Sequence, residues 1–295
     1  MASKGASKNH EAGELEALYR QYNHRCFVHP DPLEFLYQFE NPEEREIIGL
    51  IASCLAYGKV AQILRSISVI LGKMGPSPTR FLLTSRHEGL LSVFHDFKHR
   101  VTLGEDLARL LWRARSVIEQ YGSLQKCFMA HFRPEDDTVI PALEGFAKAF
   151  FPAGSPFLIP APSKGSACKR LNLFLRWMVR QDEVDPGGWD LVPPSKLVVP
   201  LDTHMHRIGL LLSFTNRKQA DLQTALEITD AFRKVAPHDP VKYDFVLTRL
   251  GIWSDRKGFF QKPPLLKEME DENLCDRRNR VCGQPPCEET HGERP

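Results

Sequence analysis

The chain has 295 residues, of which 42% are hydrophobic and 26% charged, and its formal net charge is +2. This size and composition indicate a globular protein with one or two domains, and the near-neutral balance excludes a surface that is basic all over. No stretch approaches the roughly 20 apolar residues of a membrane span. The polar residues 1–14 have no signal-peptide core. We expect an intracellular protein without a membrane partner, cytoplasmic and nucleoid-associated if the host is bacterial.

The seven cysteines are an odd number, which is typical of reduced thiols rather than of a disulfide framework. Cys275, Cys282 and Cys287 in the tail resemble an iron-sulfur loop, but a fourth ligand and the usual spacing are missing. We therefore expect no metal and no cofactor. The other four stand singly in apolar or helical context, at Cys26, Cys54, Cys127 and Cys168.

In chain order, residues 1–13 form a predicted disordered tail, residues 14–260 a folded part, and residues 261–295 a second disordered tail. Helix starts are predicted at Asp31-Pro32, Asn41-Pro42 and Asp239-Pro240, where a side-chain acceptor precedes a proline. Strand signals are almost absent. The sequence therefore predicts an all-α fold of about ten to twelve helices, and no repeat that would indicate a solenoid is visible.

Apolar residues recur at helical spacing in several segments of the folded part. Two of the predicted connections between helices, 152–169 and 181–200, are long and rich in proline and glycine. Long connections inside a helical domain are usually functional. The predicted amphipathic segments are 47–55, 107–117, 171–178, 226–232 and 243–250.

Asp202 follows Pro200-Leu201 and precedes an apolar run, so its plainest role is that of a helix N-cap. A carboxylate fixed there could also stabilise a sugar oxocarbenium ion or assist an attacking nucleophile. Lys169 falls in the first turn of a predicted helix, where the helix dipole disfavours a cation. A solvated surface lysine and a nucleophilic amine are both open for Lys169.

His204 and His206 stand two and four residues after Asp202. A metal site is disfavoured there because residues two apart on a helix point in different directions. Contact with a phosphate or helix packing are the alternatives. Basic residues are concentrated in two segments: 59–100 has seven against two acidic, and 164–217 has eight against five. These segments suit phosphate contacts, although a scattered solvated face remains open.

The run Val199-Pro200-Leu201-Asp202-Thr203-His204-Met205-His206-Arg207-Ile208 resembles the segment of endonuclease III and the helix-hairpin-helix glycosylase superfamily that carries the catalytic aspartate. Lys169 lies 33 residues upstream, a spacing similar to that in archaeal 8-oxoguanine glycosylases. Most of 15–252 also resembles a family of bacterial proteins known chiefly as a domain of unknown function. The resemblance implies that Lys169 and Asp202 are the catalytic pair.

The same resemblance implies a two-lobed fold, with a barrel lobe at about 40–165 and a second lobe from 14–39 plus 166–260. It places Tyr57, in the run Ala56-Tyr57-Gly58-Lys59, at the base pair, where it could stack on a base or be a core tyrosine. The superfamily's Leu-Pro-Gly-x-Gly hairpin is replaced by residues 159–166. The implied substrate contacts are Tyr57, Lys59, His204, His206 and Arg207, and the implied DNA-backbone contacts are Lys164, Gly165, Ser166 and Arg170.

The implied function is that of a DNA base-excision glycosylase with associated lyase activity. Its substrate would be double-stranded DNA with a damaged base, and the protein would be a monomer. The resemblance to the archaeal family implies an oxidised purine such as 8-oxoguanine as that base. Two other functions stay open. One is a non-catalytic helix-hairpin-helix nucleic-acid binder, in which Asp202 is only a cap. The other is a helical interaction protein that shows no salt-dependent DNA binding.

Overall fold

The computed structural model describes residues 3–154 and 156–255, with side chains for 12–154 and 156–250. The prediction of a helical protein is confirmed in these residues, since a single two-stranded hairpin is their only sheet. The twelve α-helices are α1 (Ser3–Tyr22), α2 (Pro42–Cys54), α3 (Val60–Met74), α4 (Pro78–Thr84), α5 (His87–Phe94), α6 (Gly104–Tyr121), α7 (Leu124–Met129), α8 (Ile140–Phe150), α9 (Lys169–Val179), α10 (Thr203–Leu211), α11 (Leu222–Val235) and α12 (Asp244–Asp255).

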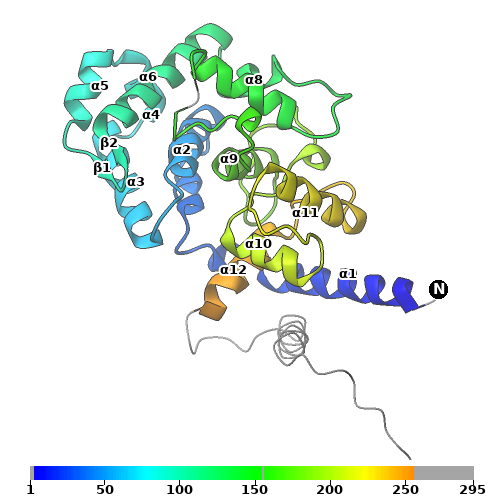
Figure 1. Cartoon of the computed structure of the whole chain (residues 1–295). Helices are drawn as coiled ribbons and strands as arrows, with labels where there is room; N and C mark the ends of the chain where they lie inside the picture. The colour runs from blue at the N-terminus through cyan, green and yellow to red at the C-terminus, as the bar shows by residue number, and fades with distance from the viewer. Residues whose placement is uncertain (1–2, 155, 256–295) are drawn as a thin grey trace, which may run out of the picture.

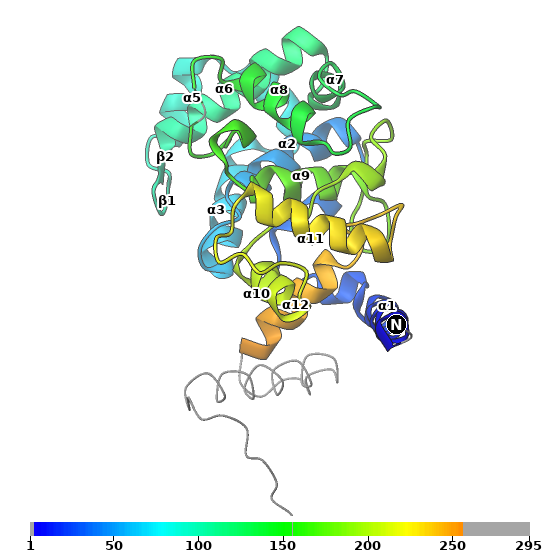
Figure 2. The same ribbon diagram turned by 45° about the vertical axis from the view of Figure 1, so that its right-hand side comes forward.

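The buried helix α9 lies in the middle of the molecule (Figures 1 and 2), with α4 to α8 on one side of it and α1, α10, α11 and α12 on the other. Its closest neighbour is α2. A side chain at Gly49 would lie only 3.2 Å from the ring of Phe174, so the two helices approach closely because Gly49 has none. The predicted apolar segments 47–55 and 171–178 are buried here, as periodicity indicated.

Two of the three predicted helix starts cap a helix. The Asn41 side chain accepts a hydrogen bond from Glu43 N at 2.8 Å and begins α2. Asp31 accepts from Leu33 N at 3.0 Å, but the element that it begins is a 3-10 helix, Pro32–Gln38. The prediction at Asp239 was wrong. α12 begins only at Asp244, and the Asp239 carboxylate instead accepts from Arg180 Nε at 2.9 Å.

Sequence patterns did not predict the hairpin of β1 (Lys98–His99) and β2 (Thr102–Leu103), because strands of two residues have no readable alternation. Arg100 turns the chain with φ +53°. His99 is buried, with its ring nitrogens 2.9 Å from Ser66 Oγ and 3.1 Å from the Tyr57 carbonyl. The hairpin is therefore fastened to α3 and to the end of α2.

The prediction of a disordered tail can be compared with the structure at the N-terminal end but not at the C-terminal end. α1 begins at Ser3, so the backbone of 3–13 is helical where a disordered tail was predicted. The predicted tail 261–295, with Cys275, Cys282 and Cys287, lies outside the described residues. Within the described part of the chain, no helix combines the length and the apolar character that crossing a bilayer requires.

Candidate active site

A cavity of about 460 Å³ lies where α3, α9, α10 and α12 meet the segments that precede α2 and α3. Of the residues singled out in the sequence, it brings together Lys169, Asp202, Tyr57 and His204. Its walls come from segments far apart in the chain. The remaining lining residues are Pro30, Asp31, Pro32, Ala56, Gly58, Val60, Ile63, Leu173, Arg176, Pro200, Leu201, Thr203, Asp244, Phe245, Thr248 and Arg249.

Lys169 is the first residue of α9, as the sequence predicted within a few positions. Cys168 precedes it with a left-handed backbone, φ +47°, which turns the long 152–169 connection sharply into the helix. The Lys169 ammonium donates a hydrogen bond to the Ala56 carbonyl at 3.1 Å. Among the described residues it has no acidic partner. The amine is thus held at the end of α2, on the cavity wall, without an ion pair.

Asp202 is the N-cap of α10, so the plain structural role is confirmed. Its Oδ1 accepts a hydrogen bond from Met205 N at 2.8 Å, which stabilises one of the free amides of the first turn. The same carboxylate is half-buried on the cavity wall. Capping fixes the orientation of the side chain, and it therefore favours rather than excludes a chemical role for the second oxygen.

Asp244 is a third ionisable residue of the cavity, and it was not assigned a role from the sequence. Its side chain is buried, and Oδ2 accepts a hydrogen bond from Arg176 Nη1 at 2.5 Å. The pKa of this carboxyl is raised to about 6, chiefly by burial. The charge of Arg176 acts in the opposite direction, and the charge of Asp202 adds to the effect of burial. Oδ1 is buried without a hydrogen-bond partner in the described part of the chain. It is therefore an unused acceptor beside the cavity.

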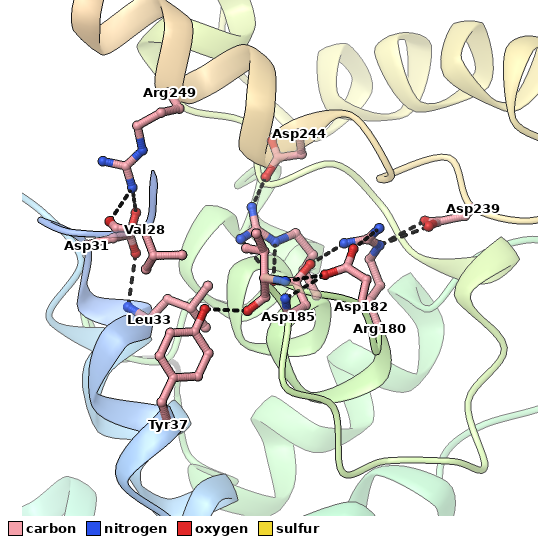
Figure 3. Close-up of polar contacts among 12 residues, drawn as sticks. Val28, Asp31, Leu33, Tyr37, Arg180, Asp182, Asp185, Asp239, Asp244 and Arg249 are labelled. Atoms are coloured by element: carbon pink, nitrogen blue, oxygen red, sulfur yellow. Dashed lines mark hydrogen bonds and ion pairs between the residues drawn. The ribbon is translucent and has the colours of Figure 1, made fainter. Parts of the chain in front are cut away.

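Behind Asp244 lies a buried network of ion pairs (Figure 3). Arg176 contacts Asp185 at 3.1 Å, and Arg180 contacts Asp185, Asp182 at 2.8 Å and Asp239 at 2.9 Å. Buried charges are tolerated when paired and hydrogen-bonded in this way. Two of the eight basic residues counted in 164–217 are thus neutralised inside the protein. Asp182 and Asp185 of the same segment are neutralised with them, so six basic residues remain against three acidic ones and the excess of three is unchanged.

The opposite wall has its own buried arginine. Arg249 Nη2 donates to the Val28 carbonyl at 2.9 Å and to Asp31 Oδ2 at 2.8 Å (Figure 3). This joins α12 to the segment before α2. With Asp31, Asp202 and Asp244 facing Lys169, Arg176 and Arg249, acidic and basic side chains balance on the cavity wall. A cavity balanced in this way suits an uncharged ligand with a polar edge.

Two further predicted residues are engaged in protein contacts. The Tyr57 hydroxyl donates to the His99 carbonyl at 2.9 Å and contacts Thr102 Oγ1 at 2.6 Å, while its ring lines the cavity. Arg170, predicted to contact the DNA backbone, does not line the cavity. Its guanidinium donates to the carbonyls of Cys54 and Phe157 and covers the Phe157 ring. The Arg170 guanidinium is therefore engaged in contacts within the protein.

The other predicted residues lie outside the cavity lining. Lys59 is exposed at the N-cap of α3, and Arg207 is exposed on α10. A ring nitrogen of His206 contacts the Arg217 carbonyl at 2.8 Å. The segment expected to replace the glycosylase hairpin is a short 3-10 helix, Pro162–Lys164, followed by Gly165 at φ +74°. Lys164 and Gly165 are exposed and Ser166 is half-buried.

The amide of Gly165 donates to the Pro162 carbonyl at 2.8 Å, so it already has a partner. One backbone amide fewer is therefore free to bind a phosphate at this turn. Asp244, Arg176, Asp31 and Arg249 were missed because their partners lie far along the chain. The one signal that could have been noticed is the acidic residue Asp244 at the start of the predicted amphipathic segment 243–250.

The chain was also compared with known proteins. Residues 31–253 match the model of a family described as "Protein of unknown function (DUF2400)". No curated protein and no solved structure matches the chain. The family match extends from Asp31, the cap of the 3-10 helix Pro32–Gln38, into α12. It includes every residue of the cavity lining except Pro30. Since it covers well over half of the 295 residues, the chain belongs to the DUF2400 family.

Proposed function

We propose that this protein is a DNA base-excision glycosylase with associated lyase activity, with Lys169 as nucleophile and Asp202 as its electrostatic partner. The observation that supports the proposal most is that both side chains line one cavity. They reach it from separate helices, α9 and α10, across 33 positions of sequence. An amine without an ion pair beside a fixed carboxylate is the constellation that such chemistry requires.

In the proposed reaction, a damaged nucleotide rotates out of the duplex into the cavity. The neutral Lys169 amine attacks C1′, the bond from C1′ to the base breaks, and the base leaves with the bonding electrons and a proton. The sugar ring then opens as the C1′–O4′ bond breaks: O4′ keeps the electron pair and takes up a proton from solvent, and the Lys169 nitrogen forms an iminium ion with C1′ in the cavity that Asp202 also lines. Loss of a proton from C2′ and of the 3′ phosphate from C3′ completes strand cleavage.

The proposal includes the two-lobed helix-hairpin-helix arrangement of this superfamily. Its support is the composition of the cavity wall. Ala56 to Ile63 come from the predicted barrel lobe at about 40–165, whereas Lys169, Asp202 and Asp244 come from the predicted second lobe, 14–39 plus 166–260. A cavity lined from both ranges is what a cleft between two such lobes requires.

The proposed partner is double-stranded DNA that contains a damaged base, bound by a monomer. The balanced charges of the lining favour an uncharged base over an anionic ligand inside the cavity. Asp244 lines the cavity, and a carboxylate is an acceptor that suits a base with an N–H donor. An oxidised purine such as 8-oxoguanine has an additional N–H donor at N7, and we propose this lesion class first.

The test is borohydride trapping, which reduces a Schiff base to a stable covalent adduct. Duplexes that contain an abasic site, 8-oxoguanine, uracil or a normal base are compared with wild type, Lys169→Gln and Asp202→Asn. We expect an adduct with wild type that is lost in Lys169→Gln and reduced by about 100-fold or more in Asp202→Asn. An adduct that persists in Lys169→Gln would exclude this lysine as the nucleophile.

One observation favours a second candidate, a non-catalytic nucleic-acid binder. Asp202 has a complete structural role as N-cap of α10, and capping alone explains an aspartate there. In that case Lys169 contacts a phosphate. Lys169→Ala would then weaken DNA binding and its dependence on salt, and wild type would give no borohydride adduct with any duplex.

A further inference from the structure

A second cavity, of about 330 Å³, lies beside the β1–β2 hairpin. It is separate from the first in its lining and mostly apolar. None of its residues was assigned a role in the proposed reaction. The lining residues are Val101, Thr102, Asp106, Arg109, Leu110, Phe151, Pro156, Phe157 and Leu158.

The lips of this second cavity expose large apolar side chains to solvent. Val101 at the tip of the hairpin is 68% exposed, and Phe157 on the connection after α8 is 55% exposed. Single exposed apolar residues are ordinary, but two that flank one cavity make a local apolar patch. Arg170 covers one face of the Phe157 ring, with its guanidinium carbon 4.2 Å from the ring centroid, so a planar group can stack on the other face.

The charge around the second cavity favours an anionic partner. Arg109 and Asp106 in the lining pair with each other at 3.0 Å. Lys98 and Arg100 on the hairpin are exposed, and within the described part of the chain neither forms an ion pair. Glu105, next to Asp106, is also exposed, so Lys98 and Arg100 together exceed it by one positive charge beside the apolar lips. An apolar peptide segment would gain nothing from it, whereas a phosphate backbone would.

Tyr57 lies between the two cavities. The Tyr57 ring lines the first cavity and lies 5.1 Å from the Phe157 ring, edge to face. The Tyr57 hydroxyl contacts Thr102, which lines the second cavity. His99 packs on the other side of Tyr57 with ring centroids 4.7 Å apart and fixes its position. Tyr57 therefore connects the linings of the two cavities through a single side chain.

We propose that the second cavity binds an unpaired nucleobase of the DNA engaged at the first cavity, stacked on Phe157 and enclosed by Val101. The cations Lys98 and Arg100 hold the adjoining phosphates. The inference rests on the proposed function in one respect, that DNA is the ligand, but it does not depend on Lys169 chemistry. Stacking of a base on an aromatic side chain strengthens binding by about tenfold.

The test is fluorescence anisotropy with a fully paired duplex and with the same duplex carrying one unpaired 2-aminopurine. We expect the full-length protein to bind the second duplex about tenfold more tightly and to quench the 2-aminopurine emission. Phe157→Ala and the gentler Val101→Ser remove the preference and the quenching. Leu191→Ala is the matched control, because Leu191 is 57% exposed and lines neither cavity.

Salt-sensitive binding without a preference for the unpaired base, or a preference that Phe157→Ala leaves intact, overturns this inference alone. A protein that binds neither duplex overturns the proposed function as well. The apolar lips could instead join two copies of the chain. A dimer in sedimentation that Phe157→Ala separates, with no preference between the duplexes, would show this and would overturn the base-binding site.

Discussion

Glu46 offers a sharp test of how burial acts on a carboxyl in this fold. It lies on α2 with only 3% of its surface exposed. It accepts hydrogen bonds from Leu124 N at 2.8 Å, Gln125 N at 3.1 Å and Trp189 Nε1 at 3.1 Å. It thereby joins α2 to the start of α7 and to the 181–200 connection that leads to Asp202.

Burial and the three donors act in opposite directions on Glu46. Burial is the larger effect and raises the pKa of the carboxyl from 4.5 to about 7. A pKa that is higher in the folded state means that the stabilising contribution is complete below pH 4.5 and is lost as the pH rises through about 7. That interval corresponds to about 3 kcal/mol of unfolding free energy.

The perturbation is Glu46→Gln, which removes the titration and keeps the shape of the side chain. Urea unfolding of wild type and variant is measured between pH 4.5 and pH 8. We expect the stability of wild type relative to Glu46→Gln to fall by about 3 kcal/mol across that range. Glu88→Gln, at an exposed position of α5 that is not among the groups acting on Glu46, is the matched control for removal of a carboxylate.

A difference that stays constant or grows with pH would refute the reasoning. It would mean that the three N–H donors outweigh burial and stabilise the charged carboxylate.

Four further predictions concern single positions. A side chain at Gly104 would lie 1.8 Å from the Phe94 carbonyl oxygen, so Gly104→Ala destabilises the fold by about 1–3 kcal/mol in thermal unfolding. Gly72→Ala, which meets nothing within 4 Å, stabilises it by up to about 1 kcal/mol. Asp202→Asn keeps the cap of α10 and changes stability little, whereas Asp202→Ala costs about 1 kcal/mol in the same assay. Arg180→Met leaves buried carboxylates unpaired and costs about 3–5 kcal/mol in urea unfolding; a smaller loss would show that these charges are solvated.

The parts of the fold that depend on local sequence could be predicted. The apolar residues of α2 and α9 indicated buried helices, although both helices are buried on all sides over 46–54 and 171–179, and Asn41 caps its helix through an atom two residues away. The hairpin at 98–103 could not, because its stability comes from His99 contacts to α3 rather than from strand propensity. Asp239 follows the local rule for a cap, but Arg180, 59 positions earlier, takes its carboxylate.

The residues of the site also divide into those that local sequence indicated and those that it did not. Lys169 and Asp202 could be proposed because each stands in a recognisable local run, and the structure places both on one cavity. Asp244 and Arg176 were missed because their pairing spans 68 positions, and neither stands in a run that indicates chemistry. For the same physical reason, sequence alone does not reveal that Arg176 and Arg180 are buried with acids.

The most direct measurement of the central claim is to locate the covalent bond. Wild-type protein is trapped with borohydride on a duplex that contains an abasic site, digested with a protease, and the peptide that carries the adduct is identified by mass spectrometry. The account predicts the adduct on Lys169. An adduct on any other amine, or none under conditions in which the duplex is bound, would contradict it.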